Sequence, residues 1–368
     1  MRNTPLIDIE KFFGANLGQF AGWLTALDFG DPIGECREVR SKVGLFDVSH
    51  MGRLLIRGSK SYQFLQKIVT KDLSKLKEGE MSGPALILNK SGGIKDDVML
   101  YKLSDLEWLM VCNAVNKEKN IQWMLSVKDE LGIPSSDVII EDITNNSVLL
   151  ALQGPKSLEI LESFGVKETK SIKLMNFVSR LKIRDAETFL VSRSGWTGEE
   201  VRSYGFEILT DIPNGIKIYR ELIEAGVRPA GLVARDILRT EMGYVLYGSD
   251  ISEDINPIEA RYWMALTRGK DDCIGCQEVW SKYREGVGRL RMGFKLKKDV
   301  KAIPRHGYKI LAGDEAIGEV TSGTYSPTID RCIGMGYINS SHAYLGFSLD
   351  ILIRDKRYEV KISDFPLI

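Results

Sequence analysis

Two adjacent aspartates, Asp96 and Asp97, come shortly after the glycine pair Gly92-Gly93 and open an apolar run. Glycine permits a tight turn with positive φ, and successive side chains along a strand point to opposite faces. One carboxylate can therefore point inward while the other points outward. A fixed carboxylate can orient a reacting group and stabilise positive charge, although from these residues alone a solvated turn acid is the commoner outcome.

Arg235 and Arg239 are four residues apart in a helix predicted to begin near Leu232, so both project from the same side. A guanidinium can bind a carboxylate through two parallel hydrogen bonds, which makes Arg235 a candidate ligand for an organic acid. The alternatives are an exposed surface arginine or a salt bridge with Asp236 or Glu241.

The five cysteines are odd in number and scattered, which does not fit a secreted disulfide framework, so reduced thiols are expected. Cys273 and Cys276 form a CxxC, but there is no second CxxC and the three histidines lie far away in sequence. We therefore expect two incidental thiols rather than a zinc or redox site, and no metal centre. His50 is expected to be structural, half-buried and bonded to the backbone.

The apolar patterns around the aspartate pair predict an α+β region. GRLLIRG (52 to 58) indicates a strand, and Ser59 is expected to cap a helix with Phe64 and Leu65 on its buried face. Further strands are predicted at 84 to 88, 98 to 103 and 107 to 114, followed by a helix from about 117 to 130. Strands that meet across such loops indicate an antiparallel sheet.

The rest of the chain continues this alternation. Strands are predicted on both sides of Asn145-Asn146, with a boundary near Ala151, and then near 177 to 183, 188 to 193 and 205 to 209. Helices follow from near Asn214 and from about 232 to 245. From about Gly288 onward, short strands alternate with Gly, Pro and Asp turns, which is typical of a small β-barrel.

The bulk composition excludes several classes of protein. The 368 residues are 43% hydrophobic and 27% charged, as in ordinary globular proteins, and their number predicts two or three compact units. Fifty basic residues balance fifty acidic ones, so no net charge draws the chain to nucleic acid or to an anionic membrane. No apolar run approaches a signal peptide or a membrane span, so we expect a cytoplasmic protein.

Five separated segments together resemble the glycine cleavage system T protein family of aminomethyltransferases. They are FAGW (20 to 23), FDVSHMG (46 to 52), GGIKDDVMLY (92 to 101), ARDILRTEMGYVLYGSDI (234 to 251) and GEVTSGTYSP (318 to 327). ALQGP (151 to 155) and SRSGWTGE (192 to 199) lie between them. In this order the segments cover nearly the whole chain, so the resemblance extends over its length.

The resemblance implies an α+β fold in which three domains form a cloverleaf around a central folate site, with antiparallel sheets and a C-terminal β-barrel. The implied domains are a discontinuous folate-binding domain of 1 to 51 plus 151 to 280, an inserted domain of 52 to 150 that carries Asp97, and a barrel of 281 to 368. It also implies transfer of a one-carbon unit from an aminomethyl-lipoyl H protein to the co-substrate tetrahydrofolate, with release of ammonia.

The same resemblance assigns roles to seven residues. Asp97, the second acid of its pair, is the implied catalytic residue, and Asp96 is mainly structural. Arg235 of the ARD motif is expected to bind the glutamate tail of folate. The implied pteridine contacts are Glu207, Tyr101, Asn113 and Trp196, of which Glu207 accepts hydrogen bonds from the aminopyrimidine edge.

The chain departs from the family pattern in ways that affect the expected pocket. Trp196 replaces a tyrosine, an insertion lies around 201 to 203, and Pro84 stands where relatives often have an aromatic residue. Trp can stack on a pteridine as Tyr does, so the aromatic face is retained while the phenol is lost.

Two other functions remain open on this scaffold. One is a folate-dependent demethylase or methyltransferase that accepts a small methylated substrate, which Asp97 fits equally well. The other is a folate-binding assembly factor without transfer activity. Retention of the DD, ARD and GFE motifs together argues against the second, because a protein that only binds folate has no evident need for the Asp97 carboxylate.

Overall fold

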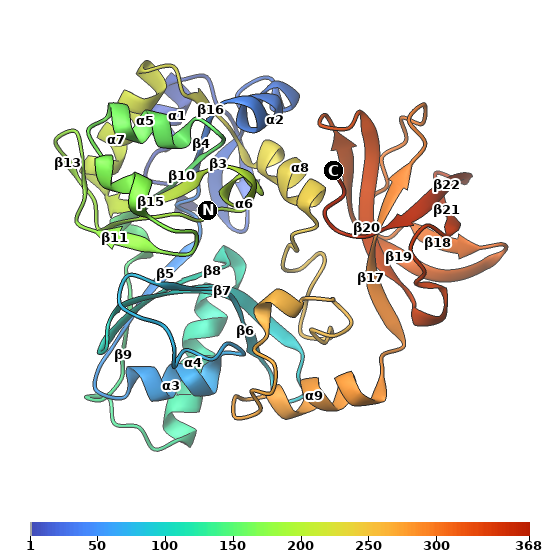
Figure 1. Ribbon diagram of the computed structural model, residues 1–368, viewed down its shortest axis with the longest axis horizontal. Coiled ribbons are helices and arrows are strands. Elements are labelled where there is room, and N and C mark those ends of the chain that lie inside the picture. The colour runs from blue at the N-terminus through green and yellow to red at the C-terminus, as the bar shows by residue number, and fades with distance from the viewer. Residues whose placement is uncertain (1) are drawn as a thin grey trace. The chain divides into compact units, whose positions relative to one another are not determined.

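The computed structural model describes residues 2–368, which form two compact units. One comprises the chain up to Ile87 together with Asp96–Arg235, and the other comprises Leu88–Lys95 together with Asp236–Ile368. Helices alternate with sheets that are mostly antiparallel, and the last strands close into a barrel (Figure 1). The predicted α+β class is therefore confirmed, whereas the division into three domains stays a prediction.

A five-stranded sheet in the first unit carries the aspartate pair. Its strands, in order, are β6 (Met81–Leu88), β7 (Ile94–Ser104), β8 (Glu107–Cys112), β5 (Gly52–Arg57) and β9 (Ile139–Asp142). Helices α3 (Ser61–Ile68) and α4 (Lys117–Glu130) lie on the same side of it (Figure 1). The predicted strands and helices are confirmed here. Ser59 as the cap of α3 is wrong, because the helix begins at Ser61, whose N–H closes a turn onto Gly58 O.

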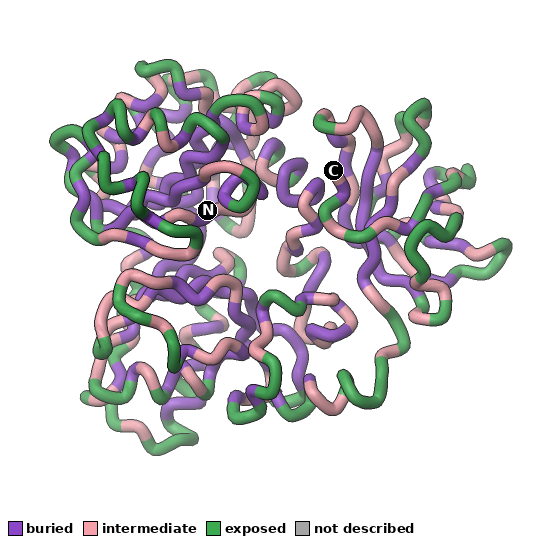
Figure 2. Tube along the Cα trace, viewed as in Figure 1, coloured by how far each residue is buried: buried purple, intermediate pink, exposed green. Residues whose placement is uncertain are grey.

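A six-stranded sheet forms the other large core of the first unit. Its order is β11 (Phe177–Ser179), β14 (Leu190–Ser192), β15 (Gly205–Asp211), β10 (Ser147–Gln153), β4 (Gly44–Asp47) and β16 (Arg228–Pro229). Strand β10 is buried along its whole length and β15 along nearly all of it (Figure 2). Helix α7 (Ile212–Glu224) packs on β10 and β15, and the Asp211 side chain caps it by accepting from Asn214 N.

Smaller elements complete the first unit. Two further sheets contain β1 (Arg2–Asn3), β3 (Trp23–Asp28) and β2 (Asn16–Phe20), and β12 (Lys182–Ile183) and β13 (Ala186–Glu187). The other helices are α1 (Ile7–Phe12), α2 (Pro32–Ser41), α5 (Ser157–Ser163), α6 (Glu199–Arg202) and α8 (Leu232–Met242), which extends into the second unit. The 3₁₀ turns of the chain are Ala114–Asn116, Thr144–Asn146, Lys167–Ser171, Trp263–Ala265 and Ser340–His342.

The second unit ends in the closed barrel that the short C-terminal strands predicted. Around the barrel the strands follow the order β17 (Arg289–Leu296), β20 (Arg331–Asn339), β19 (Glu315–Ser326), β18 (Lys309–Ala312), β21 (Ser348–Ile353) and β22 (Lys356–Ser363). Alternate residues of these strands point inward and form one apolar core that includes Phe294, Ile310 and Ile351. Helix α9 (Cys276–Glu285) precedes the barrel.

The glycine pair before the aspartates is needed for two different reasons. Gly92 has φ of 78°, the left-handed conformation that glycine adopts without steric cost. Gly93 has no room for a side chain, because a Cβ there would lie 1.8 Å from Glu253 O. Asn89 Nδ2 also donates to Glu253 O at 3.1 Å, so the loop that leads into β7 is fixed by backbone contacts of the second unit.

The cysteines differ from the prediction. Cys273 and Cys276 form a disulfide, so the expectation of two incidental reduced thiols is wrong for this pair. The reason is local: Gly275 turns the chain with φ of 75° and leaves the two Cα atoms 5.3 Å apart, within disulfide range. Cys36, Cys112 and Cys332 are buried free thiols.

Two features of residues 2–368 bear on membranes and metals. No helix there is long and apolar enough to cross a membrane. Nor does that part of the chain bring three or more His, Cys, Asp or Glu side chains together as a metal site. The cytoplasmic location stays a prediction.

Candidate functional site

The two aspartates lie side by side on β7, and both are buried. Asp96 is 0% exposed and Asp97 is 6% exposed, and the residues of β7 on either side of them are also buried (Figure 2). A solvated turn acid is therefore wrong for both positions. Because adjacent strand residues point to opposite faces, the two carboxylates have different surroundings, although Asn113 contacts both.

Asp96 is surrounded by amide donors. Asn113 Nδ2 and Asn116 Nδ2 donate to its Oδ1 at 2.7 Å each, and Asn120 Nδ2 donates to Oδ2 at 2.5 Å. The backbone N–H of Asp97 adds a bond of 3.0 Å. Burial and, after it, the nearby Asp97 charge raise the pKa of Asp96, the amide donors lower it, and the net result is a pKa of about 7. Asp96 therefore changes its charge close to neutral pH.

Asn113 links the two carboxylates. Its Nδ2 donates to Asp97 Oδ1 at 2.7 Å as well as to Asp96 Oδ1, and its backbone N–H approaches Asp96 Oδ2 at 3.3 Å. The residue follows β8 directly, and β8 pairs with β7, so the sheet places the amide beside both acids. The orientation of the Asp97 carboxylate therefore depends on an amide that Asp96 holds in place.

A second acid lies in the six-stranded sheet. Glu207 on β15 is 3% exposed, and its Oε2 accepts from Tyr101 Oη at 3.2 Å and from Ser194 Oγ at 2.7 Å. Burial raises the pKa of Glu207, while the Ser194 bond, the charge of Arg235 and the Tyr101 bond lower it. Since Tyr101 is on β7, this hydrogen bond joins the strand of the aspartates to the strand of Glu207. Because β15 lies between β14 and β10 in the sheet, Glu207 is on an interior strand and does not face solvent.

Arg235 is a half-buried cation without a bonded anion. Burial lowers the pKa of its guanidinium, and the charge of Glu207 partly offsets that effect. Within the part of the chain that the structure describes, no carboxylate oxygen lies within 4.0 Å of this guanidinium, so the salt-bridge alternatives are wrong. Asp236 bonds Arg239 at 2.8 Å instead, and Glu241 accepts from Ser326. An unpaired guanidinium in this position is suited to an incoming carboxylate.

Trp196 lies in the bend between β14 and α6, where it is half-buried. Buried Gln153 holds this bend, because its Nε2 donates to Ser194 O at 3.0 Å and its Oε1 accepts from Thr197 Oγ1 at 2.9 Å. The extra residues around 201 to 203 form the end of α6, whose Glu199 pairs with Arg40 at 2.8 Å. The insertion therefore adds an anchored helical turn beside the bend.

Pro84 and His50 have different outcomes. Pro84 lies half-buried in β6, an edge strand, where its missing N–H breaks no ladder. His50 is 2% exposed and packs edge-on against Phe20 with ring centroids 5.4 Å apart. Its buried Nδ1 has no hydrogen-bond partner, so the predicted half-buried histidine bonded to the backbone is wrong. Burial and the charges of Arg235 and Arg53 hold the pKa of His50 well below its usual value, so its ring is neutral.

Sequence reasoning missed four polar residues that support the acids. Asn116 and Asn120 are four residues apart, which is the spacing of one helical face, and both bond Asp96. Ser194 donates to Glu207, and the hydroxyl oxygens of Ser192 and Ser194 lie 2.7 Å apart. The asparagine spacing was the available signal, whereas the serines stand out only once β14 and β15 are paired.

Comparisons with known proteins agree with this arrangement over the full chain. The GCVT N-terminal domain matches residues 6–270, and the glycine cleavage T-protein C-terminal barrel domain matches residues 289–368. A probable aminomethyltransferase of Aeropyrum pernix is 38% identical over 374 residues, covering 100% of this chain and 98% of the relative. An aminomethyltransferase of Thermoanaerobacter pseudethanolicus is 39% identical over 360 residues, covering 97% and 94%.

A solved structure gives the same result for the fold. The glycine cleavage system aminomethyltransferase T of Bartonella henselae superposes with a TM-score of 0.90 at 28% identity, covering 100% of this chain and 98% of that one. The family matches, the identity to relatives and the superposition extend over both compact units. This chain therefore belongs to the glycine cleavage system T protein family, the aminomethyltransferases.

Proposed function

We propose that this chain transfers the one-carbon unit of an aminomethyl-lipoyl arm to tetrahydrofolate and releases ammonia, with a lipoylated H protein as the donor. The observation that carries the proposal is the Asp97 carboxylate, which is buried and held at 2.7 Å by Asn113 on a rigid sheet. A carboxylate fixed in this way supports chemistry on a bound molecule, which favours a transferase over a protein that only binds folate.

Asp97 is the proposed catalytic residue. The carbon of the aminomethyl group forms bonds to two nitrogens of tetrahydrofolate while its bonds to the amino nitrogen and to the lipoyl sulfur break. The two N–H protons leave with ammonia and with the free dihydrolipoyl thiol, and positive charge develops on the carbon during the transfer. A carboxylate at this point orients an attacking nitrogen and stabilises the positive charge. Because Asn113 and the strand already hold the carboxylate, little reorganisation is needed as the charge develops, and one such contact is worth about 10²- to 10³-fold in rate.

Asp96 is proposed as a positioning residue that acts through Asn113. Its carboxylate accepts three side-chain amides, and one of those amides also donates to Asp97. Since Asp96 is 0% exposed, it is not placed to touch a substrate. Its role is to keep the Asn113 amide in the orientation that directs Asp97.

The remaining residues fit a folate molecule by their chemistry. Glu207 offers a carboxylate that can accept a pair of N–H donors from the aminopyrimidine edge, with Tyr101 and Ser194 holding it. Arg235 offers an unpaired guanidinium for the glutamate carboxylate of folate. Trp196 is proposed to stack on the ring system in place of the family tyrosine. One acceptor and one aromatic face thus match the pteridine, and one cation matches the glutamate tail.

Turnover with aminomethylated H protein and tetrahydrofolate tests the proposal. We expect ammonia and methylene-tetrahydrofolate in equal amounts, and no product when either substrate is left out. Demethylation of a small methylated amine in place of this reaction would move the chain to the alternative folate-dependent transferases. Folate binding without turnover of either kind would identify a folate-binding assembly factor.

A further inference from the structure

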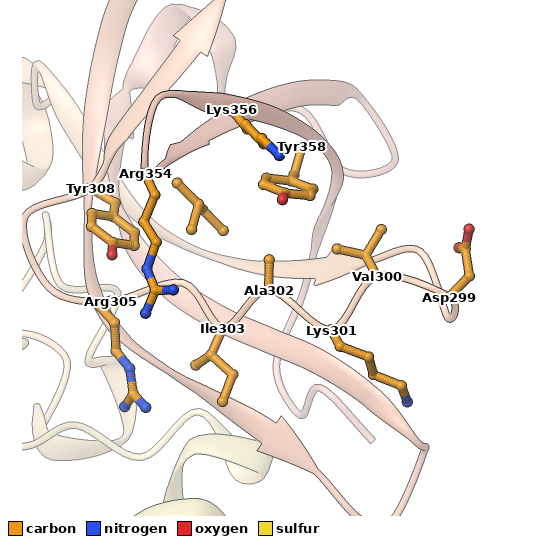
Figure 3. A pocket seen from close by; sticks show the side chains of 11 residues that line it. Asp299, Val300, Lys301, Ala302, Ile303, Arg305, Tyr308, Arg354, Lys356 and Tyr358 are labelled. Atoms are coloured by element: carbon orange, nitrogen blue, oxygen red, sulfur yellow. The ribbon is translucent and has the colours of Figure 1, made fainter.

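The barrel unit contains a cavity that includes none of the residues proposed for the transfer reaction. Its volume is about 620 Å³, and it lies between the segment 297 to 308, which connects β17 to β18, and the hairpin of β21 and β22 (Figure 3). The side chains that line it combine an apolar floor with charged groups: Asp299, Val300, Lys301, Ala302, Ile303, Arg305, Tyr308, Ile353, Arg354, Lys356 and Tyr358.

The walls of this barrel cavity are fixed, although the connecting segment has no helix or strand. Pro304 packs into a notch formed by two glycines: a Cβ on Gly323 would lie 2.2 Å from Pro304 O, and one on Gly334 would lie 3.0 Å from Pro304 Cγ. Val300 and Ile303 pack against the barrel core. A long ordered connection of this kind is usually functional, and preformed walls reduce the ordering cost of binding a ligand.

Three of the four cations at the cavity have no anionic partner. Lys301 lies 3.1 Å from Asp330. Across the described residues, by contrast, no carboxylate oxygen is within 4.0 Å of the charged groups of Arg305, Arg354 or Lys356. In Figure 3 the two arginine side chains lie on the same side of the cavity as Tyr308, and Lys356 lies beside Tyr358. With four cations and one acid, Asp299, in its lining, the cavity therefore has an excess of positive charge.

Other cations on the same barrel do have partners. Lys297 pairs with Glu359, Lys309 with Glu319, and Arg357 with Asp314, each at 2.6 Å. Arg357 is a direct neighbour of Lys356 in sequence, yet only Arg357 pairs with a carboxylate. Not every barrel cation outside the cavity is paired, since Lys295, Arg331 and Lys361 also have no carboxylate oxygen within 4.0 Å among the described residues. What distinguishes the cavity is that three such cations line one space.

The position of Arg354 in its turn supports the same conclusion. Arg354 and Asp355 connect β21 to β22 with φ of 49° and 63°. A two-residue hairpin turn with positive φ at both positions favours Asn, Asp or Gly, and a longer side chain is strained there. Arg184 has the same place in the turn between β12 and β13, with φ of 52°, and pairs there with Glu221. Arg354 differs from it in having no carboxylate oxygen within 4.0 Å among the described residues, while its side chain lines the cavity.

We propose that this cavity binds a small organic polyanion, a molecule with at least two carboxylate or phosphate groups on a body that has an apolar or planar part. Arg305 and Arg354 each supply a planar fork for one anionic group, and Lys356 adds a third positive charge. The rings of Tyr308 and Tyr358 and the apolar floor contact the body of the ligand. An inorganic ion would leave that floor unused and should bind more weakly.

Calorimetric titration of the full chain with ATP, with triglutamate and with inorganic pyrophosphate tests the site and separates phosphate from carboxylate ligands. We expect ATP or triglutamate to bind at about 0.15 M salt, more tightly than pyrophosphate. Arg354→Asn should weaken that binding about tenfold or more, the effect of one lost charge-assisted bond. Asn suits the turn, so the melting temperature should not fall. Lys361→Asn, which removes an exposed cation outside the cavity, is the matched control.

Three results would overturn the site. They are no binding of any probe below about 10 mM, binding that Arg354→Asn and Arg305→Gln both leave unchanged, and equal weakening by the control Lys361→Asn. The last result would mean that only the overall charge of the barrel attracts the probes. If pyrophosphate bound as tightly as ATP or triglutamate, the proposed contact between the cavity and the organic body of the ligand would be wrong.

Discussion

Asp96 in the first compact unit and Asp250 in the second are both 0% exposed, but their pKa values are shifted in opposite directions. Asp96 accepts only from amides and lies beside Asp97, and its pKa is raised to about 7 by burial and by that neighbouring charge. Burial also opposes the ionisation of Asp250, but Arg239 at 2.6 Å and two hydroxyl donors outweigh it and lower the pKa. A cationic partner fixes the charge of a buried acid, whereas amide partners leave it able to exchange a proton near neutral pH.

The same contrast separates two arginines four residues apart on α8. Arg239 bonds Asp236, Asp250 and Ser322, so its charge is fully used within the second unit. Arg235 has no bonded carboxylate among residues 2–368. Buried ion pairs therefore mark the structural positions of this molecule, and incompletely paired charges mark the positions proposed for function.

The largest expected effect comes from breaking the structural pair. Asp250→Asn leaves the buried Arg239 with the half-exposed Asp236 as its remaining carboxylate partner, which should lower the free energy of unfolding by about 3 kcal/mol, the lower end of the cost of breaking a buried ion pair. Urea unfolding of the full chain measures it. Asp364→Asn, which breaks the exposed pair with Arg261 at 2.8 Å, is the control and should cost less than about 1 kcal/mol. Equal losses in the two variants would contradict the structural role of Asp250.

Removing the Asp97 charge should have the next largest effect, on rate and with little effect on stability. Asp97→Asn is expected to lower the transfer rate by about 10²- to 10³-fold while keeping the fold and much of the folate binding. Single-turnover kinetics with aminomethylated H protein give the rate. Asp105→Asn, an exposed acid at the other end of β7, should leave it unchanged. Full activity in Asp97→Asn would exclude this carboxylate from catalysis.

Replacing the unpaired Arg235 should affect only the binding of tetrahydrofolate. Arg235→Ala is expected to weaken tetrahydrofolate binding by about 1.5 to 3 kcal/mol, the size of a charge-assisted hydrogen bond. A pteridine without the glutamate tail should bind to the variant as it binds to the wild type. Titrations with both ligands make the comparison, and equal losses for the two would show that Arg235 acts through structure.

Much of the fold could be predicted because local patterns determine it. The helix expected from about 117 to 130 is α4 at Lys117–Glu130, and the turn-rich C-terminal region is the closed barrel. The disulfide of Cys273 and Cys276 was missed because it depends on a glycine turn that spacing does not show. Helix α9, which begins at Cys276, was also missed in that region.

The site was predicted less completely than the fold. Motif resemblance indicated Asp97, Glu207 and Arg235, but whether a charge is paired depends on residues far apart in sequence. Nothing in the local pattern distinguishes Arg235 from Arg239, and the burial of His50 without a partner for Nδ1 follows only from the packing around it. The pairing of charges therefore has to be read from the three-dimensional structure.

The smallest expected effect on rate sharpens the contrast between Asp96 and Asp250. Asp96→Asn should lower the transfer rate less than about tenfold, since Asn113 still donates to Asp97. Its clearer signature is the pH dependence of stability. The folded-state pKa of Asp96, about 7, lies above the ordinary value of 3.8, so the folded protein binds this proton more tightly than the unfolded chain does.

The stability that Asp96 contributes is therefore fully present below about pH 4 and is lost as the pH rises through about 7. Wild-type stability should fall across this range more steeply than that of Asp96→Asn, which has no proton to lose at this position. For Asp250 the sign is opposite, because its lowered pKa gives a contribution that is lost only as the pH falls below the ordinary range of an aspartate. Urea unfolding of the wild type and Asp96→Asn at several pH values between 4 and 8 measures the difference in slope. Parallel curves would mean that Asp96 is ionised throughout, as Asp250 is, and the two buried acids would then differ in their partners but not in their charge.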